Sequence, residues 1–233
     1  PKTKDDGTEN KQPEGYITVT FKTTDKAGSV EKIVYINPNK AVELTSYAPE
    51  VKPITGYEFA DWDRPIKEKI QYNDNDVITA KFNEKGAVIP NKSPDGTENK
   101  QPDGYKTVTF VIDPTTGGKI ADGEVKVYYV NPDKEVTVPQ PKTQAETGYE
   151  FDKWKIGDQE FPTEAKKYTD NTTVKGKFTK LPDIVPSSDK QGKPNAKPNG
   201  YVTVTFDKGE HGKDITGQTV YYVNPKADLS LIH

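Results

Sequence analysis

The sequence predicts a mainly β protein, α+β at most, made of tandem small domains that proline-rich linkers join. Three observations lead to this prediction. Long segments of the 233-residue chain repeat one another in order, short runs alternate strictly between apolar and polar residues, and 18 glycines and 19 prolines interrupt the chain. Period-two alternation is typical of half-buried strands. Frequent Gly and Pro favour turns and extended linkers over long helices.

The repeat is clearest in a polar octapeptide, Asp-Gly-Thr-Glu-Asn-Lys-Gln-Pro, which occurs at 6–13 and again unchanged at 95–102. Such self-similarity is the signature of a repeat architecture. A tyrosine follows each copy, at Tyr16 and Tyr105, and a third occurs at Tyr201. We therefore divide the chain into a polar lead-in (1–15), a first repeat domain (16–90), a linker (91–104), a second repeat domain (105–186), a linker (187–200) and a truncated third repeat (201–233).

Each repeat opens with two predicted strands. The first alternates in all three copies, as in Tyr16-Ile-Thr-Val-Thr-Phe21, which places Val and Phe on one face and Thr and Tyr on the other. A turn and a short apolar strand follow, and this second strand ends at Asn-Pro in every copy. Proline lacks the N–H of a β-ladder and therefore ends the strand. We expect antiparallel hairpins whose second strands cover 33–36, 127–130 and 220–223.

Two further strands are predicted in each complete repeat. The segment after the hairpin is interpreted as a short irregular crossing, because 136–141 contains two prolines and 42–48 could form only a helical turn. Gly-Tyr-Glu-Phe-x-x-Trp then occurs at 56–62 and 148–154 and holds both tryptophans of the chain. The closing strand is predicted at 77–82 and 173–178, where apolar and polar residues alternate again.

The aromatic clusters and the linkers carry two more expectations. Trp62 and Trp154 are interpreted as the centres of small cores, and the alternative is a sugar-stacking platform. Each linker begins with an apolar patch, Ala87 to Pro90 or Leu181 to Pro186, which we expect to pack onto the preceding domain. The rest of each linker is predicted to be an extended, semi-rigid spacer.

Composition excludes several classes of function. The net charge of -3, with both signs interspersed, lacks the basic footprint of a nucleic-acid or anionic-membrane binder. The chain has no cysteine, which rules out disulfides and thiolate metal sites. No stretch approaches the roughly 20 apolar residues that cross a bilayer, so no membrane insertion is expected. The chain starts without Met or an apolar leader, and we expect an internal or processed fragment.

No catalytic or metal site is predicted. The two histidines, His211 and His233, lie in the third repeat, and His211 is interpreted as a solvated turn residue. The run from Asn73 to Asp76 offers oxygen ligands that suit Ca²⁺, but it lacks the distal Glu of a calcium loop, and turn chemistry explains it equally well. A Lys–Asn or Lys–Asp isopeptide crosslink would need a buried Lys beside an acidic catalyst, and no predicted strand places a Lys unambiguously on its apolar face. We therefore predict no enzyme activity and no cofactor.

These strands, the Gly-Tyr-x-Phe-x-x-Trp motif and the Tyr-Tyr-Val-Asn-Pro segment resemble the Listeria–Bacteroides type of surface repeat, of which the internalin B-repeat is best known. They also resemble tandem repeats of cell-wall-anchored Gram-positive proteins, including streptococcal surface repeats associated with fibronectin binding. The resemblance implies small β-grasp-like domains, a wall-anchored extracellular location and a non-enzymatic adhesin or stalk with a part in virulence. The chain departs from the family after the tryptophans, where Asp-Arg-Pro follows Trp62 and Lys-Ile-Gly follows Trp154. The alternative function is an accessory array, carbohydrate-binding or spacer, of a secreted enzyme.

A partner surface is predicted on the strand face opposite the core. Tyr105, Thr107 and Thr109, with the equivalent Tyr16 and Tyr201, fall on this face of the first strands. Exposed tyrosines on a sheet are common in binding surfaces. We expect a monomeric, elongated array that contacts a host extracellular matrix protein, fibronectin in particular. The mechanistic alternative is that a sheet edge pairs with an extended peptide through backbone groups.

Overall fold

The computed structural model describes residues 1–228. The fold is mainly β, as predicted, and the one helix among the described residues is a short 3-10 turn, η1 (Thr45–Tyr47). In the described part of the chain, no helix is long and apolar enough to span a bilayer. The chain divides into two compact units: unit 1 comprises 1–89, 101–105 and 131–134, and unit 2 comprises 90–100, 106–130 and the residues from 135 onward.

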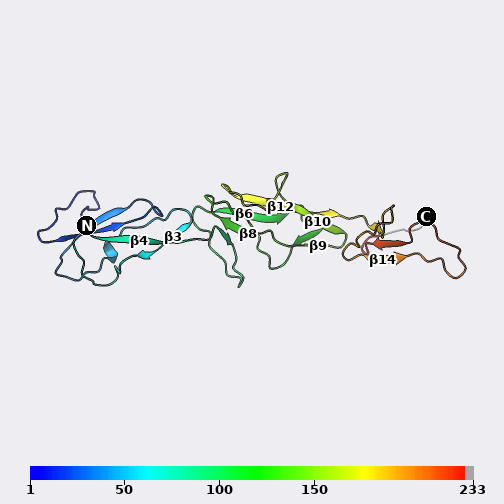
Figure 1. Ribbon diagram of the computed structural model, residues 1–233, viewed down its shortest axis with the longest axis horizontal. Coiled ribbons are helices and arrows are strands. Elements are labelled where there is room, and N and C mark those ends of the chain that lie inside the picture. Colours follow the sequence, from blue (N-terminus) through cyan, green and yellow to red (C-terminus); the bar gives the residue numbers. More distant parts are fainter. Residues whose placement is uncertain (229–233) are drawn as a thin grey trace. The chain divides into compact units, whose positions relative to one another are not determined.

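Unit 1 contains a four-stranded mixed sheet (Figure 1). Its strands lie in the order β2 (Glu31–Ile36), β1 (Ile17–Lys22), β4 (Asp76–Glu84) and β3 (Tyr57–Trp62). The predicted hairpin is confirmed, because β1 and β2 pair antiparallel from Ile17 with Ile36 onward. The first and last strands, β1 and β4, pair parallel, and β3 then runs antiparallel to β4.

One face of this sheet carries the core. Val19, Phe21 and Ile78 are fully buried, as the period-two pattern predicts. The ring of Trp62 is 7% exposed and meets Phe21 edge-on, with 4.9 Å between ring centroids. The core interpretation of this tryptophan is therefore confirmed, and its ring has too little free surface for a sugar to stack on it.

A β-bulge explains the spacing of the Phe-x-x-Trp motif. Phe59 pairs with Phe82, but Trp62 pairs with Ala80, so β3 uses one residue more than β4 over this stretch. Strict alternation would put residues three apart on opposite faces. The extra residue turns the strand, and Phe59 and Trp62 both reach the core.

Unit 2 contains the sheet of the second repeat. The strand order within unit 2 is β11 (Gln159–Glu160), β10 (Tyr149–Ile156), β12 (Thr172–Lys180), β6 (Lys106–Ile112) and β8 (Val127–Val130), and a small ribbon adds β7 (Gly118–Ile120) and β9 (Thr143–Ala145). The short strand β5 (Val88–Pro90) falls at the boundary of the two units, with Val88 and Ile89 in unit 1 and Pro90 in unit 2. The central pair, β6 and β12, is again parallel, and the same bulge lies between Phe151 and Trp154. Trp154 is 3% exposed and packs edge-on against Phe110.

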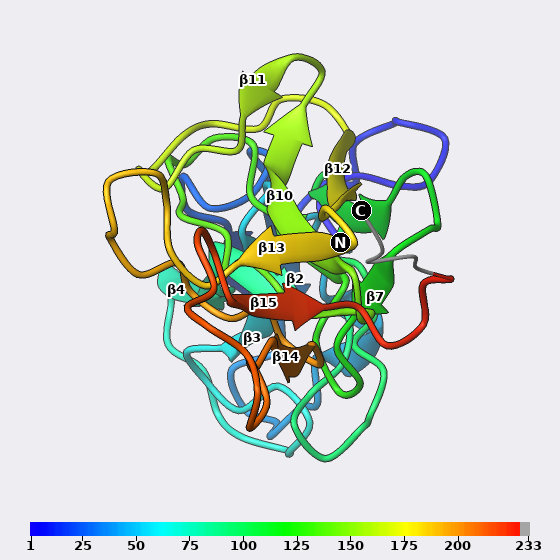
Figure 2. The same cartoon turned by 90° about the vertical axis from the view of Figure 1, so that its right-hand side faces the viewer.

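The third repeat, also in unit 2, is a three-stranded sheet (Figure 2). Its order is β13 (Ile184–Pro186), β15 (Val220–Val223) and β14 (Val202–Thr205). Phe206 is 41% exposed, whereas its equivalent Phe110 is 1% exposed, because no fourth strand covers it among the described residues. His211 is exposed in the long turn between β14 and β15, as expected, and His233 lies outside the described residues.

The linkers differ from expectation. Ile184 to Pro186 form β13, which pairs with β15 of the following repeat, so the prediction that this patch packs onto the preceding domain is wrong for these three residues. The start of the patch does contact the preceding repeat, where the amide of Leu181 donates to the carbonyl of Gly148 at 2.8 Å. Without β13, the outer edge of β15 would present unpaired N–H and C=O groups, and an extended segment such as Ile184–Val185 can form hydrogen bonds with them. The apolar side chains of a finished core offer no such backbone partners. The next residues fold into a closed loop rather than an extended spacer: the amide of Asp189 donates to the carbonyl of Lys193 at 2.9 Å, and that of Asn195 to Ser187 at 2.8 Å. The same loop closes at Thr3–Glu9 and Lys92–Glu98.

Candidate functional site at the repeat junction

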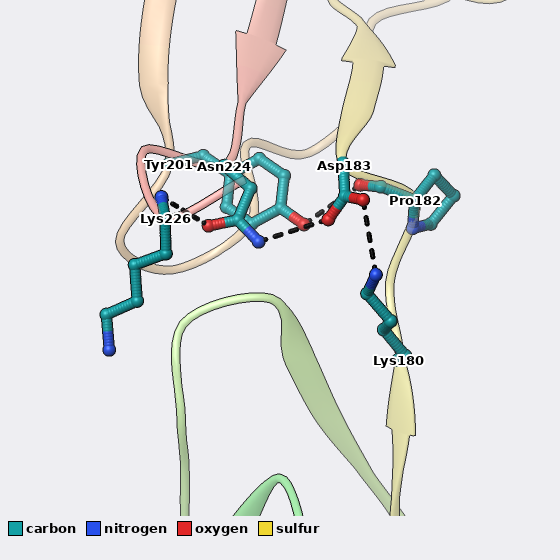
Figure 3. Close-up of polar contacts among 6 residues, drawn as sticks. All are labelled: Lys180, Pro182, Asp183, Tyr201, Asn224 and Lys226. Carbon is teal, nitrogen blue, oxygen red and sulfur yellow. Dashed lines mark hydrogen bonds and ion pairs between the residues drawn. The ribbon is translucent and has the colours of Figure 1, made fainter. Parts of the chain in front are cut away.

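The candidate site is the place where the end of the second repeat meets the start of the third, inside unit 2 (Figure 3). Tyr201 stands directly before β14, and its ring is 3% exposed. Its hydroxyl donates a hydrogen bond of 2.9 Å to the carbonyl of Pro182. Gly200, with a positive φ of +78°, precedes the tyrosine, and a Cβ there would lie 2.7 Å from Oγ1 of Thr147. The glycine is thus required both for the turn and for the close approach.

Asn224 closes the same junction from the end of β15 (Figure 3). Its backbone N–H donates to the carbonyl of Asp183 at 2.8 Å, and its side-chain Nδ2 donates to Oδ1 of the same aspartate at 3.2 Å. Its Oδ1 accepts the amide of Lys226 at 3.1 Å. Gly148, the first residue of the Gly-Tyr-Glu-Phe motif, makes room for this side chain, since a Cβ there would lie 2.6 Å from Nδ2 of Asn224.

Unit 1 contains the same arrangement. The hydroxyl of Tyr105 donates to the carbonyl of Gly86 at 2.9 Å, and the backbone N–H of Asn131 donates to Ala87 at 2.9 Å. Oδ1 of Asn131 accepts the amide of Asp133 at 3.0 Å. A Cβ at Gly56, with its φ of +91°, would lie 2.5 Å from Nδ2 of Asn131. The tyrosine, the asparagine and the glycine therefore build one junction twice.

The chemistry of this junction is that of a buried polar joint. Asn131 and Asn224 are the buried polar residues among the residues that the structure describes. A buried amide is stabilising only when its hydrogen bonds are made, and then it fixes one geometry. Burial raises the pKa of the Tyr105 and Tyr201 hydroxyls above the ordinary value of 10.0. Both phenols therefore stay protonated and able to donate at neutral pH.

Ion pairs flank both junctions but add little. Nζ of Lys180 lies 3.2 Å from Oδ2 of Asp183, and Lys134 pairs with Glu84 in unit 1. The lysine and glutamate side chains are about half exposed, so water and salt screen the attraction. The specificity of the junction consequently comes from the tyrosine and asparagine hydrogen bonds.

The predicted partner residues differ in how deeply the structure buries them. The expectation that Tyr105 and Tyr201 are exposed is wrong, because the alternation of the strands begins only after them, and the glycine turn directs each ring toward the preceding repeat. Tyr16 is 36% exposed. Thr107 and Thr109 are partly buried on the face of β6 opposite the core. Whether any of these residues binds a partner stays a prediction.

The aspartates in the turns accept hydrogen bonds from nearby threonines. Oδ1 of Asp74 accepts hydrogen bonds from the backbone N–H of Thr18 at 2.8 Å and from its hydroxyl at 3.0 Å, and these bonds lower the pKa of the carboxyl. Asp6 and Asp95 bind the amides of Thr8 and Thr97 in the same way. Within residues 1–228, no three His, Asp or Glu side chains gather as a metal site requires.

Sequence reasoning used the asparagines only as part of the strand-ending Asn-Pro pair and did not assign them a site. The available signal was the recurrence of Asn before Pro at the same point in all three repeats. Comparison of the chain with protein-family models, with curated proteins and with solved structures finds no match.

The junction makes a direct prediction for its tyrosine. Tyr105→Phe removes the hydroxyl that binds Gly86, and we expect it to lower the free energy of unfolding by about 0.5–1.5 kcal/mol, the usual net value of one hydrogen bond. Tyr16→Phe is the matched control, because its ring stands at the equivalent position but is 36% exposed. Urea unfolding followed by circular dichroism measures both. Equal losses in the two variants would contradict the role of the hydroxyl.

Proposed function

We propose that the chain is a non-enzymatic array of tandem repeats from a cell-wall-anchored Gram-positive surface protein, and that it acts as a stalk and adhesin. The observation that carries the proposal is the junction built twice from equivalent residues. Its buried asparagines and tyrosines join the end of one repeat to the start of the next. Repeats that bury polar groups against their neighbours stabilise one another, as in other repeat proteins.

The sheet supports the assignment to small β-grasp-like domains. In unit 1 the first and last strands, β1 and β4, are parallel neighbours, with β2 and β3 outside them. One short crossing segment, which contains η1, connects the two halves. This strand order is the basis on which we assign the repeats to the surface-repeat type named above.

The adhesive surface that we propose is the open face of the sheet in unit 2. Thr107 lies beside Tyr129 on β8, and Thr109 lies beside Thr173 on β12. Thr107, Thr109 and Tyr129 are partly buried, so their neighbours order them while they still reach solvent, and Thr173 is exposed. A tyrosine among hydroxyl groups offers a flat apolar ring together with hydrogen-bonding groups, which suits contact with a matrix protein such as fibronectin.

Surface plasmon resonance with immobilised fibronectin tests the adhesive part of the proposal. We expect saturable binding of the full chain, and about tenfold weaker binding of the double variant Thr107→Asp/Tyr129→Ser, because the new charge and the lost ring fall at the centre of the contact. Tyr47→Ser, an exposed aromatic on η1, is the matched control. Absence of binding by the unmodified chain would contradict adhesion, and an equal loss in the control would contradict the choice of surface.

A further inference from the structure

No described strand pairs with the outer edge of β2 in unit 1, and what we infer about this edge rests on the proposed function as a repeat array. In the third repeat the corresponding strand, β15, has this edge covered by β13. Ile184 pairs with Val223 and Val185 with Tyr222. The pairing is closed at its ends by hydrogen bonds from Ser187 to the carbonyl of Val220 at 2.9 Å and from Asn224 to the carbonyl of Asp183 at 2.8 Å.

The edge of β2 carries only the last part of this pairing. The amide of Lys2 donates to the carbonyl of Ile33 at 2.8 Å, as Ser187 does to Val220. Pro1 takes the place of Pro186: its carbonyl accepts Nδ2 of Asn10 at 3.0 Å, and that of Pro186 accepts Nδ2 of Asn195 at 2.9 Å. β2 is an outer strand of its sheet, and no described residue accepts the backbone N–H of Asn37.

A groove of about 290 Å³ lies along this edge. It is lined by Tyr16, Tyr35, Ile36, Asn37, Val42 and Leu44 among others. Tyr16 is 36% exposed here, against 3% for the equivalent Tyr201 beneath its strand. Asn37 is already oriented, since its Oδ1 accepts the amide of Asn39 at 3.0 Å, as Oδ1 of Asn224 accepts Lys226 at 3.1 Å. The groove along β2 is therefore equivalent to the edge of β15 that pairs with β13, but no described strand pairs with it.

We propose that this edge of β2 binds an extended apolar pair that precedes a proline, donated by the end of another repeat of this type. The segments Val88–Ile89 and Ile184–Val185 of this chain show the chemistry required. The bound strand exchanges backbone hydrogen bonds with Tyr35 and offers carbonyls to the amide of Asn37 and the hydroxyl of Tyr16. Strand addition of this kind takes its affinity from the backbone and its selectivity from the alternate side chains.

Amide hydrogen exchange measured by NMR tests the proposal. The variant is the full chain with the sequence of residues 83–89, Asn-Glu-Lys-Gly-Ala-Val-Ile, added directly before Pro1. We expect exchange at Asn37 and Tyr35 to slow by at least about tenfold relative to the unextended chain, because these amides become hydrogen-bonded. The matched control is the same extension with Asp-Ser in place of Val-Ile. The amide of Val34, which lies in the pairing with β1, is an internal reference that stays unchanged.

Three results would overturn the proposal. The first is unchanged exchange with the Val-Ile extension, and the second is equal slowing with the Asp-Ser control. The third is concentration-dependent protection of Asn37 in the unextended chain: Ile184 and Val185 are already paired with β15 in their own chain, so the occupant would then be another surface of a second copy. Fibronectin binding separates this inference from the proposed function: retained binding without protection removes the docking site alone, and protection without binding removes only the adhesive role.

Discussion

Trp154→Ala is expected to destabilise the second repeat by about 3–5 kcal/mol, the usual cost of removing a large buried aromatic. The ring is 3% exposed and meets Phe110 and Phe151 at centroid distances of 5.0 and 5.1 Å. Its loss therefore removes the centre of the aromatic cluster and leaves a cavity. In a domain of this size such a loss is comparable with the whole free energy of folding.

Urea unfolding of the variant gives a clear readout, because Trp62 remains as the single tryptophan and its fluorescence reports on the first repeat. We expect circular dichroism to show an early transition, while the tryptophan transition shifts much less, because a small number of junction bonds links the first repeat to the destabilised second repeat. Tyr47→Ala is the control, since this ring is 42% exposed. A variant that unfolds at the midpoint of the unmodified chain would contradict the core role of Trp154.

Gly176→Ala is expected to cost about 1–3 kcal/mol, although the equivalent position of the first repeat is the buried Ala80. Gly176 pairs with Trp154 across the strands, and a Cβ there would lie 2.7 Å from the indole ring and 2.8 Å from the ring of Phe151. The gain from restricting the unfolded chain, about 0.4–1 kcal/mol, is smaller than this steric cost. The two repeats therefore pack their tryptophans differently over the same backbone position.

Thermal unfolding of Gly176→Ala and of Ala80→Gly tests this difference. Both variants are expected to melt at lower temperature: the first through crowding, and the second through the greater flexibility of glycine in the unfolded chain and the lost methyl group. An increase in melting temperature for Gly176→Ala would show that the aromatic cluster of the second repeat has room for a methyl group.

The parts of the fold that local sequence determines were predicted well. Alternation placed Val19, Phe21 and Ile78 in the core, and the Asn-Pro pairs marked the ends of the second strands. The bulge after Phe59 could not be predicted, because an alternating pattern does not indicate where an extra residue is inserted in a strand.

The junction was harder to predict for a different reason. The positions of Tyr105 and Tyr201 depend on a glycine turn that directs the ring out of the strand pattern, and the contact partners lie in the preceding repeat. The pairing of β13 with the following repeat likewise depends on which sheet edge is free, which is a property of the folded protein. Sequence patterns report the burial of a residue within its own strand and not its neighbours from another repeat.

The parallel pairing of the first and last strands determines how a repeat responds to mechanical force. If tension pulls β1 at its beginning and β4 at its end, the two strands are drawn in opposite directions along their length. The hydrogen bonds between Val19–Lys22 and Asp76–Thr79 then carry the load together in shear and do not open one after another like a zip. The corresponding pair in the second repeat, β6 and β12, extends from Val108 to Ile112 and is loaded in the same geometry. The first and second repeats are therefore built to resist stretching along the chain.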